Sequence, residues 1–270
     1  TDLDAKHQVT VIVTDHKKAP QQGKNVAVKG DLGQSAAGKT DKKGELTVPE
    51  VEQTERHGVY IVGYTDGTFG PSRSMTRSEA AAIFARLLAE KNGDTISTAA
   101  NTKFADIPAH AWYSGYVKYL SNNGITYGKS KTIFAPNDAI TRAEFTTMAV
   151  RFFDVYGDGD AEIMEQFSGF NDVSSGYWAA EYIKYAALHG WINGYGDGSF
   201  HADREINRAE VVTIVNRLLG READEDYIAD NLRKLNTFPD VSRKHWAYYA
   251  VMEAANAHTA VLGENESWSK

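Results

Sequence analysis

The sequence of 270 residues contains no cysteine. This absence excludes a disulfide framework, a thiolate nucleophile and a metal centre with cysteine ligands. A run of about 18 apolar residues is also missing, so we expect no membrane-spanning helix. The chain starts at Thr1 without an initiating methionine or a basic-then-apolar leader, and we therefore expect a fragment of a longer protein.

Basic residues are in the minority, with 29 Lys and Arg against 36 Asp and Glu and a formal net charge of −7. A general nucleic-acid binder needs a basic surface to neutralise phosphates, so nucleic acid is not an expected partner. Hydrophobic residues make up 42% of the chain and charged residues 24%, which is an ordinary globular composition. The length allows one large domain or two smaller ones.

The N-terminal segment, 1–56, carries short β-strand patterns. A β-branched run covers 8–14, apolar and polar residues alternate over 25–29, and 38–49 has the pattern of strand, tight turn and strand before a proline. We predict a small β-sandwich-like module over 1–56 that acts as a spacer or packing module.

The rest of the chain contains an internal repeat. Three arginines recur at nearly equal intervals, each with a phenylalanine eight positions before it and a glycine six positions before that phenylalanine. Apolar residues after each arginine fall in one helical register, which predicts a helix there. The residues are Arg77, Arg142 and Arg208; Phe69, Phe134 and Phe200; and Gly63, Gly128 and Gly194.

A second recurring pattern has a phenylalanine, an aspartate two positions later and a tryptophan eight positions later, followed by a helical stretch. We call this segment the front half of a repeat and the glycine–phenylalanine–arginine segment with its helix the back half. The front-half residues are Phe104, Asp106 and Trp112; Phe170, Asp172 and Trp178; and Phe238, Asp240 and Trp246.

The order of the halves predicts how they assemble. A back half at 58–91 precedes two full units at 104–153 and 170–219, and a lone front half at 238–258 follows them. We predict a mainly α fold in which three helix-loop-helix units form a closed pseudo-threefold ring, because closure hides every apolar face. The predicted domains are 1–56 and 57–270, with unit 1 at 57–92 plus 237–262, unit 2 at 103–155 and unit 3 at 168–220.

Helix capping explains most of the motif around each arginine. A Thr or Asn precedes the arginine and a Glu follows three positions after that cap, which is the spacing of a capping box. The predicted capping residues are Thr76, Glu79, Thr141, Glu144, Asn207 and Glu210.

The arginines themselves lie in the first helical turn, where the helix dipole disfavours a cation. Their recurrence therefore indicates a role, and two interpretations stay open. One is binding of a carboxylate or phosphate by the guanidinium and the free backbone N–H groups. The other is a structural salt bridge, for example to Asp66 or to an acidic residue of the next unit.

Three further sets of residues are site candidates with a structural alternative. The Asp-Gly pairs of the loops are turn signals, while glycine also lets a sugar ring approach the backbone. The phenylalanines are expected in the core. The tryptophans are expected there too, although a partly exposed one could stack on a sugar at a binding groove. The loop candidates are Gly63, Tyr64, Asp66 and Gly67 in the first copy and Gly194, Tyr195, Asp197 and Gly198 in the third.

The three copies differ in these loops. The middle copy has Lys129, Ser130, Lys131 and Thr132 in place of the Tyr-x-Asp-Gly segment. It loses the tyrosine, the aspartate and the second glycine, gains two cations and keeps its arginine. We expect its groove either to be impaired or to bind a more anionic ligand.

Signatures of catalysis are missing. The sequence has no Gly-x-Ser-x-Gly elbow, no phosphate-binding loop and no pair of histidines one helical turn apart, and the acidic stretch 154–162 lacks EF-hand spacing. We expect no enzyme activity, no cofactor and no metal. A glycoside hydrolase would need one asymmetric acidic cleft rather than repeated arginines.

The repeats resemble S-layer homology (SLH) domains over 58–258. The resemblance is carried by Gly63 to Phe69 followed by Thr76 to Glu79, and by Phe170 to Val173 with Trp178, Gly190 to Phe200 and Asn207 to Glu210. The segment 1–56 is loosely similar to bacterial Ig-like or carboxypeptidase-regulatory-like modules.

The resemblance implies an extracellular, non-catalytic anchor on the bacterial cell wall. Its ligand would be an anionic secondary cell-wall polymer, often with a pyruvylated amino sugar, bound in grooves between units by the motif arginine. Peptidoglycan as the ligand, or self-assembly with other surface-layer proteins, are the alternatives. The implied ligand-binding residues are Arg77, Arg142, Arg208, Gly63, Tyr64, Asp66, Gly67, Gly194, Tyr195, Asp197, Trp112, Trp178 and Trp246.

Overall fold

The computed structural model describes short stretches between residues 10 and 47, and then 53–156, 167–262 and 267–269. The described part is mainly helical, with seven α-helices and a small three-stranded sheet beside two strand pairs. The chain divides into two compact units, one of 1–56 with 259–270 and one of His57–His258. None of the described helices combines the length and the apolar character that crossing a membrane requires.

The first unit contains short antiparallel strands. Strand β1 (Thr10–Ile12) pairs with β4 (Glu45–Thr47), and β2 (Asn25–Lys29) pairs with β3 (Ser35–Lys39). The strands on either side of the turn at 42–43 thus have different partners instead of forming one hairpin. A third sheet has the order β5 (Gln53–His57), β6 (His258–Leu262) and β7 (Ser267–Ser269). The sandwich-like module stays a prediction, since much of 1–52 lies outside the described residues.

The helices predicted after the three arginines are confirmed in the second unit. They are α1 (Arg77–Asn92), α3 (Arg142–Tyr156) and α5 (Arg208–Leu219). The front halves form the shorter helices α2 (Ser114–Asn122), α4 (Ala180–Leu188) and α7 (Tyr248–Ala255). The charged segment before the last front half forms α6 (Glu225–Asn231) and a 3-10 turn (Leu232–Lys234).

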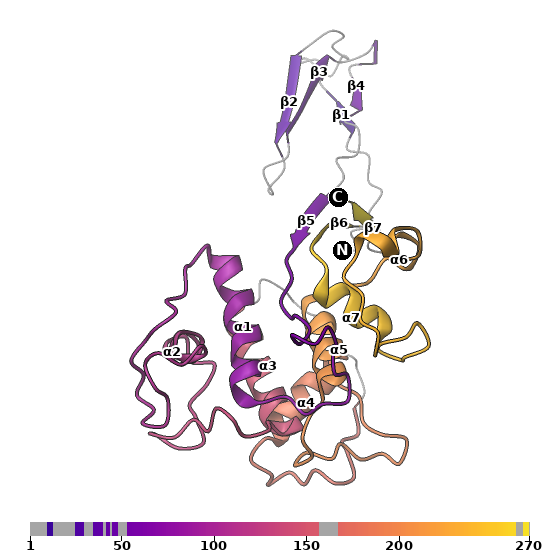
Figure 1. The fold of residues 1–270 in the computed structure, drawn as a ribbon. Helices are drawn as coiled ribbons and strands as arrows, with labels where there is room; N and C mark the ends of the chain where they lie inside the picture. Colours follow the sequence, from indigo (N-terminus) through magenta and orange to yellow (C-terminus); the bar gives the residue numbers. More distant parts are fainter. Residues whose placement is uncertain are drawn as a thin grey trace. The chain divides into compact units, whose positions relative to one another are not determined.

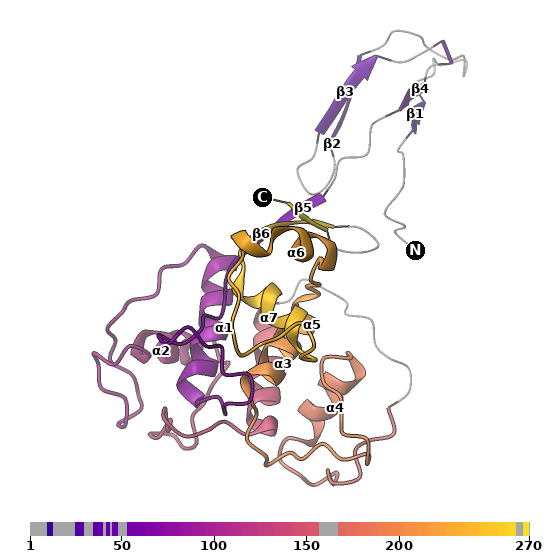
Figure 2. The same ribbon diagram turned by 45° about the vertical axis from the view of Figure 1, so that its right-hand side comes forward.

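The three long helices lie in the middle of the helical unit, with α1 and α5 both packing on α3 (Figures 1 and 2). Each short helix packs on the long helix that precedes it in the chain, so α2 lies on α1, α4 on α3 and α7 on α5. Rings of Phe84, Phe145 and Phe152 contribute to the core between α1 and α3, with centroids 5.3 and 4.9 Å from that of Phe84. The back-half phenylalanines are fully buried, which confirms their predicted place in the core.

A recurring geometry joins each front half to a back-half loop. The carboxylate of Asp106 accepts hydrogen bonds from the backbone N–H groups of Phe134 and Ala135. Asp172 accepts the two equivalent hydrogen bonds from the backbone N–H groups of Phe200 and His201. These bonds fix the loop just before the chain turns toward the arginine helix.

The C-terminal front half makes the equivalent contact with the first back half. Asp240 accepts from Phe69 N–H at 2.9 Å and from Gly70 N–H at 2.7 Å. The Phe238 ring lies 5.3 Å from that of Phe69, and Tyr60 N–H donates to the carbonyl of Ala254. These contacts join residues 60–70, near the start of the helical unit, to residues 238–254, near its end.

The expectation of buried tryptophans is wrong. Trp112, Trp178 and Trp246 are 54%, 58% and 65% exposed. The buried face of each short helix starts one position later and continues at helical spacing, and Trp lies beside that stripe rather than in it. The stripes are Tyr113, Val117 and Leu120; Ala179, Ile183 and Ala186; and Ala247, Val251 and Ala254.

Candidate functional site

The motif arginines lie at the junctions between copies, and each bonds to the phenylalanine loop of another copy. The Nε atom of each arginine donates to the carbonyl of a phenylalanine at 2.8 Å. Arg77 bonds to Phe134, Arg142 to Phe200 and Arg208 to Phe69. The bonds link the first copy to the second, the second to the third and the third to the first. We name each junction after its arginine.

The guanidinium groups are buried, each residue being 4% exposed. Arg77 pairs with Glu144 and Arg142 pairs with Glu210, both at 3.1 Å, while Arg208 donates to the carbonyl of Val62 at 2.7 Å. Burial lowers the pKa of Arg142 and of Arg208. The salt bridge to the next copy, one of the two interpretations of the sequence, is thus present at two junctions.

The glutamates also cap their own helices. Thr76 Oγ1 accepts from the N–H of Glu79, whose carboxylate accepts from the N–H of Thr76. Asn207 with Glu210 and Thr141 with Glu144 form the same reciprocal bonds. At positions 144 and 210 the carboxylate therefore serves a cap and an inter-copy ion pair at once.

A tyrosine ring contacts two arginines at two of the junctions. In the Arg208 junction the Tyr64 ring has Arg73 at 4.1 Å and Arg208 at 4.7 Å from its centroid. In the Arg142 junction Tyr195 has Arg142 at 5.1 Å and Arg204 at 5.3 Å. Arginine over an aromatic face is a cation–π contact.

The Arg77 junction replaces this arrangement with an ion pair. Lys129 occupies the tyrosine position, and Asp138 occupies the position of Arg73 and Arg204, four positions before the motif arginine. Their Nζ and carboxylate oxygen are 2.8 Å apart, and this contact lowers the pKa of Asp138. The cation gained at Lys129 is therefore neutralised, while Lys131 remains exposed.

Packing accounts for the candidate glycines at 63 and 194. A Cβ on Gly63 would lie 2.5 Å from a ring carbon of Phe238, and one on Gly194 would lie 2.5 Å from a ring carbon of Phe170. The front-half phenylalanine thus occupies the space that a side chain would need. Gly67 and Gly198 have positive φ angles of 82° and 80°.

The candidate aspartates of these loops hold their own turns. Asp66 accepts from the N–H and hydroxyl of Thr68, and Asp197 accepts from the N–H and hydroxyl of Ser199. These hydrogen bonds, foremost from the Thr68 and Ser199 hydroxyls, lower the pKa of both aspartates. Both side chains remain at the surface of their loops.

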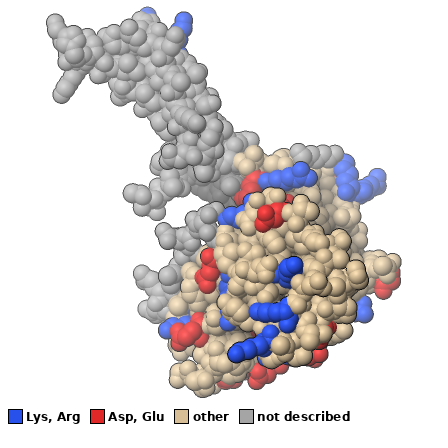
Figure 3. Space-filling model, turned by 90° about the vertical axis from the view of Figure 1, so that its left-hand side faces the viewer, with Lys and Arg blue, Asp and Glu red and all other residues tan. Residues whose placement is uncertain are grey.

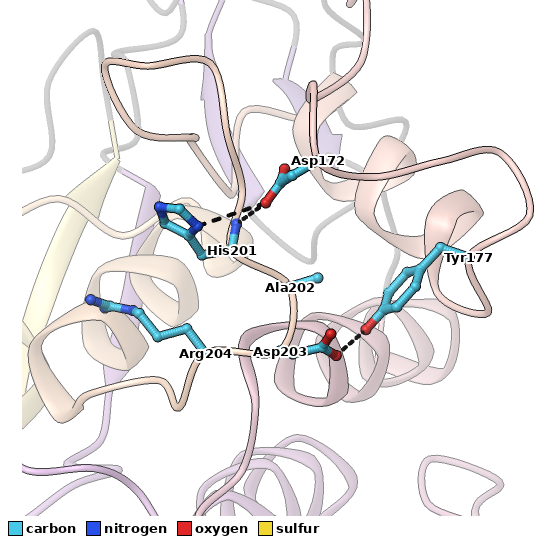
Figure 4. A pocket seen from close by; sticks show the side chains of 6 residues that line it. All are labelled: Asp172, Tyr177, His201, Ala202, Asp203 and Arg204. Atoms are coloured by element: carbon cyan, nitrogen blue, oxygen red, sulfur yellow. Dashed lines mark hydrogen bonds and ion pairs between the residues drawn. The ribbon is translucent and has the colours of Figure 1, made fainter.

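A pocket of about 550 Å³ lies beside the Arg142 junction, and six residues line it (Figure 4). The loop that lines the pocket is hydrogen-bonded to the arginine helix of this junction. Ala143 N–H donates to the carbonyl of Ala202, and Arg142 N–H donates to the carbonyl of Arg204. Burial and a 2.7 Å hydrogen bond to Asp203 raise the pKa of Tyr177 to about 12. The lining residues are Asp172, Tyr177, His201, Ala202, Asp203 and Arg204.

The pocket combines aromatic, cationic and hydrogen-bonding groups. Trp178 is largely exposed next to Tyr177, with the ring centroids 5.8 Å apart. Arg204 belongs to the loop before α5, which also supplies His201, Ala202 and Asp203 to the lining, and its guanidinium bonds to Glu210. The sequence interpretation missed Tyr177, His201 and Arg204. An arginine four positions before the motif arginine in the first and third copies was the available signal for Arg204 and Arg73.

Three segments match the family model described as "S-layer homology domain", at 41–81, 103–146 and 169–212. The first match begins within the N-terminal strand segments, before the repeat pattern at 58. The lone front half at 238–258 lies outside these ranges.

Surface proteins of bacteria are similar over most of the chain. Cell surface glycoprotein 1 of Acetivibrio thermocellus is 34% identical over 78% of this chain and 9% of its own length. The cellulosome-anchoring protein of that organism is 30% identical over 86% of this chain and 49% of its own. The surface-layer 125 kDa protein of Lysinibacillus sphaericus is 32% identical over 59% of this chain and 13% of its own.

The chain thus spans half the length or less of these relatives. Each matched segment contains the loop before one arginine helix and ends at the fifth residue of that helix, and the similarity to the relatives extends over most of the same chain. The chain belongs to the S-layer homology domain family.

Proposed function

We propose that this chain anchors a surface protein non-covalently to the bacterial cell wall, outside the cell and without catalysis. The ligand is an anionic secondary cell-wall polymer, bound at the junctions between copies. The observation that carries the proposal is the pocket at the Arg142 junction, which Tyr177 and Arg204 line together with Asp172 and Asp203, and beside which the exposed Trp178 lies next to Tyr177.

The helical unit acts as a closed pseudo-threefold ring in this proposal. The three arginine-to-carbonyl bonds, which run from copy to copy and return to the first, support closure. Docking of Asp240 on the first loop supports a first unit made of 57–92 and 237–262. Unit 2 then covers 103–155 and unit 3 covers 168–220.

The ligand contacts are assigned to the outer residues of each junction. The motif arginines bond to loop carbonyls and glutamates, and Gly63 and Gly194 face phenylalanine rings. We therefore assign these residues to the support of the site rather than to contact with the ligand. Exposed indoles can stack on a sugar face, and exposed arginines can pair with a carboxylate or pyruvyl group. Basic side chains also gather on one face of the helical unit despite the acidic overall charge (Figure 3).

The junctions differ in charge, which favours unequal binding. Counted over the motif arginine, its glutamate and the two exchanged positions, the Arg142 and Arg208 junctions each have two arginines and one capping glutamate, a net charge of +1. Asp172 and Asp203 also line the pocket beside the Arg142 junction. The Arg77 junction combines Arg77 and Lys129 with Asp138 and Glu144 and is neutral. We therefore assign the polymer to the Arg142 and Arg208 junctions and regard the Arg77 junction as impaired.

Co-sedimentation with purified cell walls tests the proposal, before and after acid extraction of the secondary polymer. The Arg204→Ala variant should bind walls at least about tenfold more weakly, because it loses a charge-assisted contact of about 1.5–3 kcal/mol. Trp178→Ala should weaken binding similarly. The matched control is Trp112→Ala, which removes the equivalent indole beside the neutral junction and should bind like wild type.

The outcomes separate the ligands. Binding that disappears on extraction supports the polymer, whereas binding that survives assigns the site to peptidoglycan. Charge reversal of Arg77 or Arg208 is unsuitable as the main test, since these buried groups hold the copies together. Failure of the wild-type chain to bind either preparation would contradict anchoring and favour self-assembly, which analytical ultracentrifugation would show as multimers.

A further inference from the structure

Three buried side chains with metal-binding groups meet in the helical unit, away from the three junctions. His57, Glu253 and His258 are 3%, 0% and 7% exposed. His57 ends β5, Glu253 lies in α7 and His258 starts β6. The sequence interpretation expected no metal, because residues so far apart in the chain form no recognisable ligand spacing.

The carboxylate lies between the two imidazoles. His57 Nδ1 is 3.3 Å from Oε1 of Glu253, and His258 Nε2 is 3.3 Å from Oε2. The two rings meet edge to face with their centroids 5.0 Å apart. One ligand atom from each residue lies within 4.8 Å of the others.

The tautomer of His258 is fixed by its other nitrogen. Nδ1 is 3.0 Å from the carbonyl oxygen of Asn256, and since a carbonyl only accepts, Nδ1 carries the proton of this bond. In the neutral ring the lone pair of Nε2 then faces the Glu253 carboxylate. Two electron-rich atoms at this distance need a cation between them, either a proton on Nε2 or a metal ion.

We propose that His57, Glu253 and His258 bind one divalent transition-metal ion of the zinc class. Ligand bonds of about 2.0–2.2 Å at tetrahedral angles put two donors about 3.4 Å apart, close to the 3.3 Å from each histidine nitrogen to its nearer oxygen of Glu253, Oε1 for His57 and Oε2 for His258. Since all three donor atoms lie within 4.8 Å of one another, no pair needs to approach by more than about 1.4 Å on binding, which ring rotations and side-chain shifts provide. Two imidazoles with one carboxylate suit zinc, while calcium and magnesium prefer all-oxygen sites.

A backbone bond to the far nitrogen of a ligating histidine is the usual support of such sites, and Asn256 supplies it here. Among the residues that the structure describes, Tyr60 and Arg221 are further ionisable groups near this cluster. Burial above all raises the pKa of Tyr60, on which both Arg221 and Glu253 act electrostatically, so the phenol stays protonated. Arg221, which is buried and donates to the carbonyl of Gly58, carries a positive charge that would oppose a bound cation.

A bound ion would hold the start of the helical unit to its end. His57 directly precedes the first back half, and the other two ligands belong to the C-terminal front half and the strand that follows it. The metal would therefore strengthen the same closure that Asp240 makes, and binding to the folded state alone raises stability.

The test uses the full chain, stripped with EDTA and dialysed at pH 7.5 against Zn²⁺. Wild type should retain one Zn²⁺ per chain and gain about 5–10 °C in Tm at 100-fold excess over Kd. His258→Gln should lose at least nine tenths of the bound zinc and the whole Tm gain. His110→Gln, which changes an exposed histidine, is the matched control and should behave like wild type.

Retention of less than about one fifth of an equivalent by wild type, or equal zinc binding by the His258→Gln and His110→Gln variants, would overturn the proposal. If the His258→Gln variant lacks the helical circular dichroism of wild type, Co²⁺ decides the matter. Wild type loaded with one equivalent of Co²⁺ should show visible d–d bands of a four- or five-coordinate nitrogen–oxygen site, and their absence would equally overturn the proposal.

Discussion

Two glycines in one loop have different reasons to be glycine. Gly194 faces the ring of Phe170 and the carbonyl of Ser199, at 2.5 and 2.6 Å from a Cβ placed on it. Gly196 has no atom within 4 Å of such a Cβ. Close packing, rather than loop flexibility, therefore requires the first glycine. The same ring and carbonyl contacts recur at Gly63 and Gly128, and Gly128 also has a positive φ of 80°.

The Gly194→Ala substitution should lower the free energy of unfolding by about 1–3 kcal/mol, because the methyl group must displace the buried ring or the backbone. Gly196→Ala should change it by less than about 0.5 kcal/mol. Urea unfolding followed by circular dichroism measures both. Equal effects of the two substitutions would show that the Phe170 contact is not what constrains Gly194.

The Asp240→Ala substitution removes both hydrogen bonds from the carboxylate to the first loop. The N–H groups of Phe69 and Gly70, both buried residues, would lose a charged acceptor, so the loss should be about 2–4 kcal/mol. Thermal or urea unfolding provides the measurement. Asp230→Ala, at an exposed position in α6, is the control and should unfold like wild type, and a similar tolerance at position 240 would argue against docking of the C-terminal segment.

At the scale of the elements, the three junctions share the same arrangement but differ in the residues at two positions. These are the tyrosine position of the loop and the position four residues before the next motif arginine. A tyrosine with an arginine stands at two junctions, and a lysine with an aspartate stands at the third. The two positions change together, because either a ring with a cation or two opposite charges can fill the same space favourably. The exchange keeps the local contact and removes one net positive charge.

The double substitution Tyr195→Lys with Arg204→Asp places the lysine–aspartate pair of the Arg77 junction at the corresponding positions of the Arg142 junction. Wall binding should fall at least about tenfold while Tm changes by only a few degrees, because the fold already accepts this pair at positions 129 and 138. Co-sedimentation and calorimetry provide the measurements. The reciprocal change, Lys129→Tyr with Asp138→Arg, should strengthen wall binding, and weaker binding of this variant would contradict the charge argument.

At the scale of the whole molecule, the last front half supplies contacts to both ends of the helical unit. Helix α7 packs on α5, while Asp240 and Phe238 contact the first loop. Asn216 of α5 joins this region by donating to the carbonyl of Ala250 and accepting from the Tyr60 hydroxyl. Loss of the segment would uncover Phe69 and one face of α5 at the same time.

A chain ending at residue 236 should therefore lose its cooperative thermal transition, as followed by far-ultraviolet circular dichroism. The matched truncation removes 1–52 and keeps the helical unit with β5, and it should retain the transition of the full chain. A cooperative transition at an unchanged temperature in the chain ending at 236 would show that the repeats are stable without closure.

Periodicity in the sequence was sufficient to predict the three arginine helices, their capping residues and the buried phenylalanines. These features depend on neighbours within one or two helical turns, so a local pattern encodes them. The front halves were also visible as a repeat, and their order predicted that the C-terminal segment has no partner nearby in the chain. The family resemblance followed from the same residues.

Only the tertiary structure decided what the repeated residues contact. Trp112, Trp178 and Trp246 are exposed because the buried stripe starts one position later, and the arginines face carbonyls and glutamates that other copies supply. Pairing of Lys129 with Asp138 and the meeting of His57 with Glu253 likewise depend on chain segments brought together by folding. Contacts between distant segments depend on three-dimensional packing, which spacing along one chain does not record.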